Sequence, residues 1–366
     1  LKRCTRNFSN LWSRIMINYQ NRIVQEDMST IVSQSYIQWD RMTNKSVMIT
    51  GANGMLATYM VYVLAYLNET QNANIKIIAT ARNIEKAKAR FSDLSKMSNF
   101  ELIKHDVTEN VNYESNVDYI VHAASNASPR FILEDPVGII NANVIGTLNM
   151  LKLAEAKKTT NFLFLSTREI YGKSVQDKID EEAYGGFDIL ATRACYPESK
   201  RMAETLLKCY SEQYGVPFTV ARIAHSYGPG MVFDNDGRIM SDLLSNVLHN
   251  EDIILKSDGS AERAFCYLSD AVSALFLTLL QGVNQNAYNV GNEDSPVQIR
   301  DLASKLVELF PEKEIKVVFD IPKNMSAGYS KMGRTYLDTT KIENLGWEKV
   351  VGLEEGLKRT IQSVEV

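Results

Sequence analysis

The chain has few cysteines, and no two of them are spaced as in a metal or redox motif. Its 366 residues include 4 cysteines, Cys4, Cys195, Cys209 and Cys266, with no Cys-x-x-Cys pair among them. Scattered cysteines are typical of reduced thiols in a cytosol and not of a disulfide framework or a zinc site. We therefore expect a cytoplasmic protein without a metal.

The sequence also lacks an excess of positive charge and a long apolar run. A formal net charge of -4 at pH 7 gives no basic field that would attract nucleic acid. The apolar stretch YMVYVLAYL, which starts at Tyr59, is too short to span a bilayer and follows a glycine-containing loop, so we expect a buried helix there. These features predict neither a nucleic-acid partner nor a membrane.

Acidic residues are missing from the start of the chain, where none occurs between Leu1 and Gln25. From Glu26 to Met42, apolar side chains recur at roughly helical spacing. We predict an N-terminal extension over residues 1–44 that is partly helical and packs its apolar face on the following domain.

From Val47, the sequence VMITGANGMLATYMVYVLAYLNE has the order strand, glycine turn, helix. The first glycine permits a tight turn, the second lets the backbone approach a pyrophosphate, and the alanine in the third position lets helix and strand pack closely. The pattern predicts a dinucleotide-binding loop. Its cofactor-binding residues would be Gly51, Asn53, Gly54, Met55 and Leu56.

A second strand, NIKIIATARN, lacks the acidic residue that would bind the adenine ribose at its end and has Arg82 there. Arginine can pair with the extra phosphate of NADP, so Arg82 favours NADP unless it is an exposed charge at the start of a helix. Asp106 and Val107 end a third strand. Ala123 and Ala124 end a fourth, where small side chains would let the cofactor lie close.

Strands and helices continue to alternate as far as FTVARIAHSYGP, which starts at Phe218. This order predicts an α/β fold, a doubly wound parallel sheet of the Rossmann type with a smaller C-terminal substrate-binding domain. We place the N-terminal extension at 1–44 and the dinucleotide-binding domain at 45–222, with 265–280 returning to it. The substrate domain would be mainly 223–366.

Two further motifs carry chemistry. FLFLSTREIYG, from Phe162, predicts a buried central strand that ends at Thr167, Arg168 and Glu169, where ligands bind in open α/β sheets, although a solvated ion pair would fit this stretch equally well. Tyr196 and Lys200 lie four residues apart on one face of a predicted helix. An ammonium lowers the pKa of a nearby phenol, so Tyr196 could take a proton from a sugar hydroxyl as a hydride leaves the same carbon.

Together these motifs resemble the extended short-chain dehydrogenase/reductases that act on nucleotide sugars, from about Lys45 to the C-terminus. The family's TGxxGxxG loop appears as TGANGMLA from Thr50, its Tyr-x-x-x-Lys motif as Tyr196 to Lys200, and its catalytic hydroxyl as Thr167. The stretches ASNASP, NVIGTLNMLKLA, RACYPESKR, NDGR and RAFCYLSDAV are most similar to the UDP-glucuronate decarboxylases, also called UDP-xylose synthases.

The resemblance implies that bound NAD oxidises C4 of UDP-glucuronate, that the resulting β-keto acid loses CO2, and that the ketone is then reduced again. Tyr196 is the implied base, Lys200 tunes it, and Glu169 assists proton delivery. The implied catalytic residues are Thr167, Glu169, Tyr196, Lys200 and Arg263, and the implied substrate contacts are Ser125, Arg168, His225, Arg238 and Arg263.

Three residues depart from the family pattern. Arg168 replaces a small hydroxyl residue and could pair with Glu169 or bind a carboxylate. His225 replaces an asparagine and could be structural or a ligand contact. Arg82 replaces an acid and keeps NADP open as the cofactor.

Other functions also fit. An NADP-dependent 4-ketosugar reductase would need only Thr167, Tyr196 and Lys200, and a nucleotide-sugar 4-epimerase needs few specific groups but leaves Glu169 without a role. Dehydration is disfavoured because Arg168 stands where 4,6-dehydratases carry an aspartate. Outside enzymes, a non-catalytic dinucleotide sensor is the alternative, and an absence of turnover would favour it.

The family resemblance also implies a homodimer built from the helices near 141–156 and 196–213. Unless they simply cover their own sheet, the apolar contacts would be Met150, Leu151, Leu153, Met202, Leu206 and Leu207.

Overall fold

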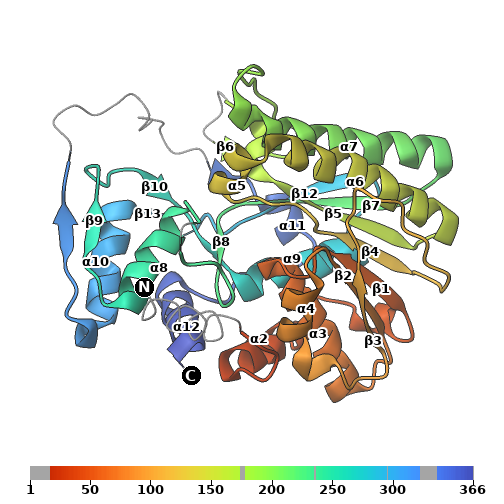
Figure 1. Cartoon of the computed structure of the whole chain (residues 1–366), viewed down its shortest axis with the longest axis horizontal. Helices are drawn as coiled ribbons and strands as arrows, with labels where there is room; N and C mark the ends of the chain where they lie inside the picture. The colour runs from red at the N-terminus through yellow and green to blue at the C-terminus, as the bar shows by residue number, and fades with distance from the viewer. Residues whose placement is uncertain (1–16, 174–177, 235, 295, 322–335, 366) are drawn as a thin grey trace, which may run out of the picture.

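A seven-stranded parallel sheet forms the centre of the molecule (Figure 1). The computed structural model describes residues 17–173, 178–234, 236–294, 296–321 and 336–365. The strands, in the order β12-β7-β5-β4-β1-β2-β3, are β1 Ser46–Thr50, β2 Lys76–Ala81, β3 Phe100–Lys104, β4 Tyr119–His122, β5 Asn161–Thr167, β7 Phe218–Ile223 and β12 Asn286–Val290. The chain changes direction across the sheet between β1 and β4, which opens a crevice at the carboxyl ends of the strands. The predicted doubly wound α/β fold is confirmed.

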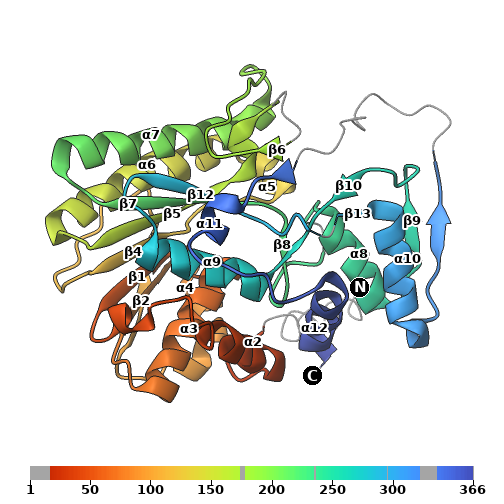
Figure 2. The ribbon, with the colours of Figure 1, turned by 180° about the vertical axis from the view of Figure 1, so that it is seen from behind.

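Helices cover both faces of this sheet. One face packs against α3 Met55–Gln71 and α9 Leu268–Gln281, and the smaller α2 Arg22–Val32 packs on these two helices and shares one apolar core with them, β1 and β2. The other face packs against α6 Pro136–Lys157 and α7 Cys195–Tyr214 (Figure 2). Because α3 is apolar nearly all round, it can be covered only by lying between the sheet and α2. The predicted buried helix is confirmed.

A smaller body packs around its own apolar core beside the sheet. Its helices are α8 Ile239–His249, α10 Ile299–Leu309 and α12 Leu353–Glu365, and its strand pairs are β9 Ile253–Leu255 with β14 Val317–Phe319 and β10 Glu262–Arg263 with β13 Val297–Gln298. Not every late segment belongs to this body. Helix α9 lies within the segment 265–280 that was predicted to return to the dinucleotide-binding domain, and it packs in the large core. Strand β12, which follows α9, pairs with β7 in the large sheet. Ile342 and Trp347 also pack into the large core.

Short elements connect these parts. They are α4 Ile84–Arg90, α5 Pro129–Glu134, α11 Thr340–Glu343, β6 Lys178–Ile179, β8 Ser226–Tyr227, β11 Cys266–Tyr267 and β15 Tyr336–Leu337, with 3-10 turns η1 Trp39–Met42, η2 Ser92–Leu94, η3 Arg168–Tyr171, η4 Thr192–Ala194 and η5 Pro311–Lys313.

The N-terminal helix differs in extent from its prediction. Helix α2 begins at Arg22, because the Asn21 side chain caps it by accepting from the backbone N–H groups of Ile23 and Val24, and it ends at Val32. A turn and η1 follow, so the apolar spacing over 26–42 comes from two separate elements. The part of the predicted extension at 1–16 lies outside the described residues. Where it is described, the extension packs on the large domain as expected.

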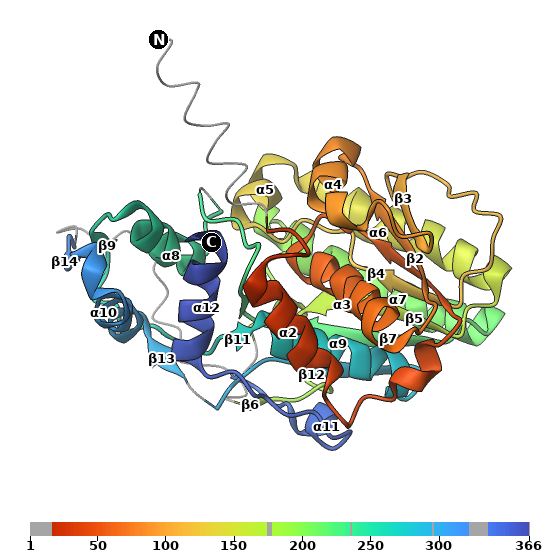
Figure 3. The ribbon, with the colours of Figure 1, turned by 90° about the horizontal axis from the view of Figure 1, so that it is seen from below.

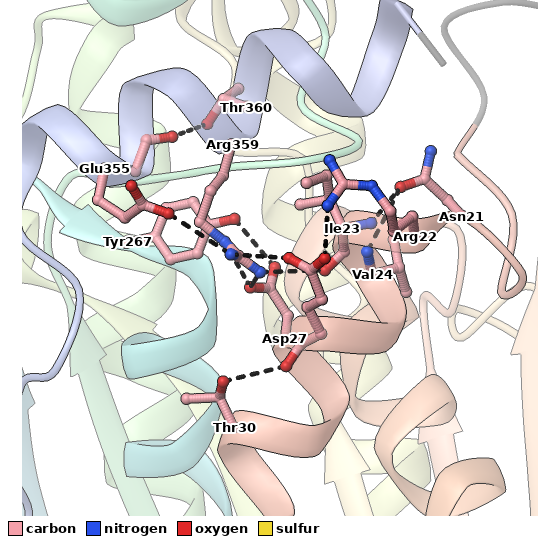
Figure 4. A network of polar contacts seen from close by, with 12 residues as sticks. Asn21, Arg22, Ile23, Val24, Asp27, Thr30, Tyr267, Glu355, Arg359 and Thr360 are labelled. Carbon is pink, nitrogen blue, oxygen red and sulfur yellow. Dashed lines mark hydrogen bonds and ion pairs between the residues drawn. The ribbon is translucent and has the colours of Figure 1, made fainter.

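A buried carboxylate joins α2 to three other elements, and Figure 4 shows its contacts with β11 and α12. The Asp27 side chain is 1% exposed and accepts hydrogen bonds from the hydroxyls of Tyr59 in α3, at 2.8 Å, and Tyr267 in β11, at 2.9 Å. Arg359 of α12 donates to its other oxygen at 2.8 Å. Figure 3 shows α12 beside α2. One carboxylate therefore links the N-terminal extension, the glycine-loop helix and the smaller body.

Helix α6 is long and apolar enough to span a membrane, but half of its most apolar stretch is buried inside the structure. Met150, Leu151 and Leu153 pack with Leu207 of α7 against the central sheet. These four residues therefore cover their own sheet and are not available as dimer contacts, which is the second of the two possibilities given for them above. Of the two remaining candidates, Leu206 is partly buried and Met202 is 50% exposed.

Candidate active site

A cavity of about 1400 Å³ lies at the carboxyl ends of the sheet strands and reaches the smaller body. Every residue predicted to bind the cofactor or the substrate, or to act in catalysis, lines it. They are Gly51, Asn53, Gly54, Met55, Leu56, Arg82, Asp106, Val107, Ala123, Ala124, Ser125, Thr167, Arg168, Glu169, Tyr196, Lys200, His225, Arg238 and Arg263. Segments distant in the sequence thus contribute to one continuous site, which is larger than the roughly 300–1,000 Å³ of an ordinary ligand pocket.

The glycine loop has the shape that a dinucleotide requires. Gly51 adopts φ +64°, and a Cβ there would lie 2.7 Å from the Cα of Ala124. A side chain at this position would therefore collide with the end of β4. Helix α3 begins directly after the loop, no side chain of the described residues caps its N-terminus, and its first turn lines the cavity.

Two polar atoms next to this loop remain without a hydrogen bond among the described residues. They are the buried Oδ1 of Asn53 and the buried Oγ of Ser125. Buried polar atoms normally have partners, so these two are suited to contact a bound polar ligand. The loop, the helix N-terminus and these atoms together fit a dinucleotide cofactor.

The end of β2 carries Arg82, whose side chain is 81% exposed and lies 3.9 Å from the carboxylate of Asp106. Asp106 also accepts hydrogen bonds from the backbone and the hydroxyl of Thr108. Arg82 therefore stands at the rim of the cavity in a weak ion pair.

Thr167, Tyr196 and Lys200 meet at the end of β5. The Thr167 hydroxyl favours the ionised form of the Tyr196 phenol, and the Lys200 ammonium donates to the carbonyl of Leu165 at 2.7 Å. Lys200 also lies over the ring of Phe164, 4.5 Å from its centroid. The Tyr/Lys spacing thus brings both side chains to the same strand end, as the sequence predicted.

The electrostatics differ from the expectation. Burial, followed by the charge of Glu169, raises the pKa of Tyr196 above its usual range, while Thr167, Arg193 and Arg238 oppose this rise. Burial lowers the pKa of Lys200 to about 7. The pKa of Tyr196 is therefore raised in the cofactor-free structure and not lowered as expected, because desolvation outweighs the attraction of nearby cations.

Glu169 has a partner that the sequence reasoning missed. Nη2 of Arg193 lies 2.8 Å from each of its carboxylate oxygens. The same guanidinium lies 5.9 Å from the centre of the Tyr196 ring. Arg193 lies in the stretch RACYPESKR, three residues before Tyr196, and this position is the one signal for it in the sequence.

The remaining substrate candidates gather where the smaller body meets the sheet. Nη1 of Arg168 lies 2.8 Å from Nε2 of His225. Arg263 donates to the carbonyl of Glu262 at 2.7 Å. Arg238 pairs with the buried Asp236, whose carboxylate also accepts from Ser241 at 3.1 Å. Three guanidinium groups thus occupy this half of the cavity, which suits an anionic ligand.

The sequence is similar to characterised families and proteins. Residues 47–291 match the family described as NAD dependent epimerase/dehydratase. The chain is 35% identical over 317 residues to UDP-glucuronic acid decarboxylase 6 of Arabidopsis thaliana, covering 86% of this chain and 87% of that protein. It is 40% identical over 266 residues to UDP-glucuronic acid decarboxylase 1 of Xenopus tropicalis, covering 72% of this chain and 60% of that protein.

Solved structures share the fold. UDP-glucuronic acid 4-epimerase from Bacillus cereus, in complex with UDP-glucuronic acid and NAD, superposes with a TM-score of 0.72 at 20% identity, covering 87% of this chain and 99% of that one. dTDP-glucose 4,6-dehydratase from Bacillus anthracis, in complex with NAD, superposes with a TM-score of 0.71 at 22% identity, covering 88% and 96%. At this identity the likeness concerns the fold alone.

Proposed function

The chain belongs to the NAD dependent epimerase/dehydratase family, and we propose that it is an enzyme that decarboxylates UDP-glucuronate to UDP-xylose. The observation that carries the proposal is the position of Glu169, whose carboxylate is fixed by Arg193 in the same cavity as Thr167, Tyr196 and Lys200. Relatives named UDP-glucuronic acid decarboxylase match over most of this chain and support the choice of substrate.

NAD is the cofactor in this proposal. The turn at Gly51 and Gly54 and the N-terminus of α3 would hold its pyrophosphate, and Ala123 and Ala124 would let it lie against the end of β4. When bound, it accepts a hydride from C4 of the sugar and later returns it, so that no net oxidation occurs.

In the first step, Tyr196 removes the proton from the C4 hydroxyl. Thr167, which lines the same cavity and favours the ionised Tyr196, orients that hydroxyl. Lys200 is held by the carbonyl of Leu165 at the end of β5, within one helical turn of Tyr196. A charged Lys200 favours the tyrosinate, and with its pKa near 7 only a small change in its surroundings sets that charge.

The second step follows from the product of the first. A ketone at C4 is β to the carboxylate on C5, so CO2 leaves and its bonding electrons move into an enolate of the C4 ketone. Protonation of C5 ends this step, and Glu169 assists delivery of that proton. Arg193 keeps the Glu169 carboxylate oriented toward the sugar.

Mass spectrometry of UDP-glucuronate incubated with the purified protein tests the proposal, with NAD, with NADP and with neither added. We expect a product lighter by one CO2, without accumulation of reduced cofactor, and stimulation by NAD above that by NADP. An unchanged mass with a changed retention time would indicate 4-epimerisation. Turnover only of 4-ketosugars with NADPH would indicate a ketoreductase, in which Arg82 would pair with the extra phosphate of NADP.

A homodimer through α6 and α7 is part of the proposal. Ile145 and Met202 are exposed apolar residues on these two neighbouring helices, beside the partly buried Leu148 and Leu206. Light scattering coupled to size exclusion should give twice the chain mass, and Met202→Glu should reduce it to the mass of one chain. A monomeric wild-type protein would contradict the proposal.

A further inference from the structure

Arg168 and His225 form a contact that the proposed reaction does not use. Nη1 of Arg168 lies 2.8 Å from Nε2 of His225, and both residues line the cavity. They come from different parts of the chain, since Arg168 begins η3 directly after β5, and His225 lies between β7 and β8. The contact therefore ties the strand end that carries Thr167 and Glu169 to the start of the smaller body.

The direction of this hydrogen bond is fixed by chemistry. A guanidinium has only donors, so Nε2 of His225 must be the acceptor and the imidazole must be neutral. Burial first, and then the positive charges of Arg168, Arg263 and Arg238, lower the pKa of His225 to about 3. His225 therefore remains an acceptor for Arg168 at neutral pH.

The backbone of His225 is itself constrained. It adopts φ +38°, in the left-handed region that few residues other than glycine occupy. Its carbonyl accepts a hydrogen bond from the N–H of Cys266 at 3.2 Å, and its ring lies 5.9 Å from the ring of Phe265, centre to centre. A strained conformation persists where its surroundings hold it, so the ring offers Arg168 a fixed acceptor.

Arg168 lines the cavity together with two further guanidinium groups, those of Arg238 and Arg263, which suit an anion. Burial chiefly lowers the pKa of Arg168, while the carboxylates of Glu293 and Glu169 favour its charged form and Arg263 opposes it. In the sequence it stands between Thr167 and Glu169. Under the proposed function, on which this step rests, Thr167 contacts the hydroxyl at C4 and Glu169 acts at C5. The carboxylate of glucuronate is attached to C5 and is therefore the nearest substrate anion.

We propose that Arg168 is a specificity-determining residue that binds the carboxylate of the nucleotide sugar, and that His225 is the positioning residue that aims its guanidinium. Because the negative charge leaves the carboxylate as CO2 forms, the ion pair stabilises the bound substrate at least as much as the transition state. Arg168 therefore lowers KM and sets the choice of substrate, and it does not raise kcat.

Calorimetric titration with UDP-glucuronate and with UDP-glucose, which lacks the carboxylate, tests the proposal. We expect Arg168→Ser to weaken binding of UDP-glucuronate by about 10- to 100-fold and that of UDP-glucose by less than about threefold. Arg168→Lys should retain part of the preference. His225→Asn should weaken the binding of UDP-glucuronate and leave that of UDP-glucose unchanged. The double variant, with Arg168→Ser and His225→Asn, should bind UDP-glucuronate no more weakly than Arg168→Ser does. Arg300→Ser, which removes an arginine outside the cavity, is the matched control.

Each outcome has a distinct meaning. An equal loss of affinity for the two ligands would overturn the proposal, since Arg168 would then contact the nucleotide or support the fold. Unchanged affinity for both would also overturn it, since Arg168 would then not contact the ligand. An additive effect of His225→Asn would overturn the positioning role. Since the titration needs no turnover, a wild-type protein that prefers the carboxylate but releases no CO2 would contradict only the proposed function.

Discussion

Arg193 holds Glu169 from the start of α7, with Nη2 at 2.8 Å from each carboxylate oxygen. The same guanidinium lies over the ring of Tyr196. One side chain thus contacts both the acid assigned to C5 and the base assigned to C4. Because the two steps of the proposed reaction occur on neighbouring carbons, this geometry keeps both groups in register with one bound sugar.

Glu169→Gln removes the acid and keeps the volume of the side chain. We expect the rate of UDP-xylose formation to fall by about 10²- to 10⁴-fold, the range for a general acid or base, while NAD binding is unchanged. Glu198→Gln on α7, which loses only a pair with Arg201, should have no effect. A Glu169→Gln variant with wild-type turnover would remove Glu169 from the mechanism.

Arg193→Gln leaves Glu169 without its ion pair. We expect kcat to fall by about 10- to 100-fold because the carboxylate loses its orientation, with KM changed by less than about threefold. Arg193→Lys should restore part of the rate. Since the two residues act as a unit, Arg193→Gln combined with Glu169→Gln should be no slower than Glu169→Gln. Additive losses would show that Arg193 acts elsewhere.

Lys200 makes the stability of the cofactor-free protein depend on pH. Its pKa is about 7 in the folded chain, against an ordinary value of 10.5. Between these values the unfolded chain binds a proton that the folded chain lacks. The free energy of unfolding should therefore rise with pH across this window, by up to about 1.4 kcal/mol per unit, relative to Lys200→Met. Urea denaturation of both proteins at pH 7, 8 and 9 measures this slope. A constant difference would mean that Lys200 keeps its ordinary pKa.

The Asp27 network should dominate the stability of the N-terminal extension. Asp27→Ala leaves two buried tyrosine hydroxyls without their acceptor and leaves Arg359 with only its more exposed carboxylate partners, Glu26 and Glu355. We expect a loss of about 3–5 kcal/mol in the free energy of unfolding, measured by denaturant titration. Glu26→Ala removes the more exposed partner of the same arginine and should cost less than about 1 kcal/mol. Similar losses for both would contradict a buried clamp.

Local patterns predicted much of this molecule. The strand, glycine turn and helix at Val47, the buried strand at Phe162 and the Tyr196/Lys200 spacing each lie within one short segment, and sequence periodicity reports such segments directly. The end of α2 at Val32 was missed because the apolar residues of η1 continue the same spacing.

Pairs between distant segments could not be predicted in this way. Glu169 and Arg193 are separated by 24 positions, and Asp27 and Arg359 by 332. No periodicity links such residues, since only the packing of complete elements brings them together. The apolar residues of α6 and α7 pose a related problem, because the sequence alone does not separate the side chains that cover the sheet from those that face outward.

Proton NMR of the product formed from UDP-glucuronate in D2O, with NAD present, tests the central claim most directly. The account predicts UDP-xylose that carries one deuterium at C5, because CO2 leaves an enolate there that takes its new proton from exchangeable groups. It also predicts that Glu169→Gln slows the appearance of this product. Recovery of a nucleotide sugar that keeps its carboxylate, with or without inversion at C4, would contradict decarboxylation as the reaction of this site.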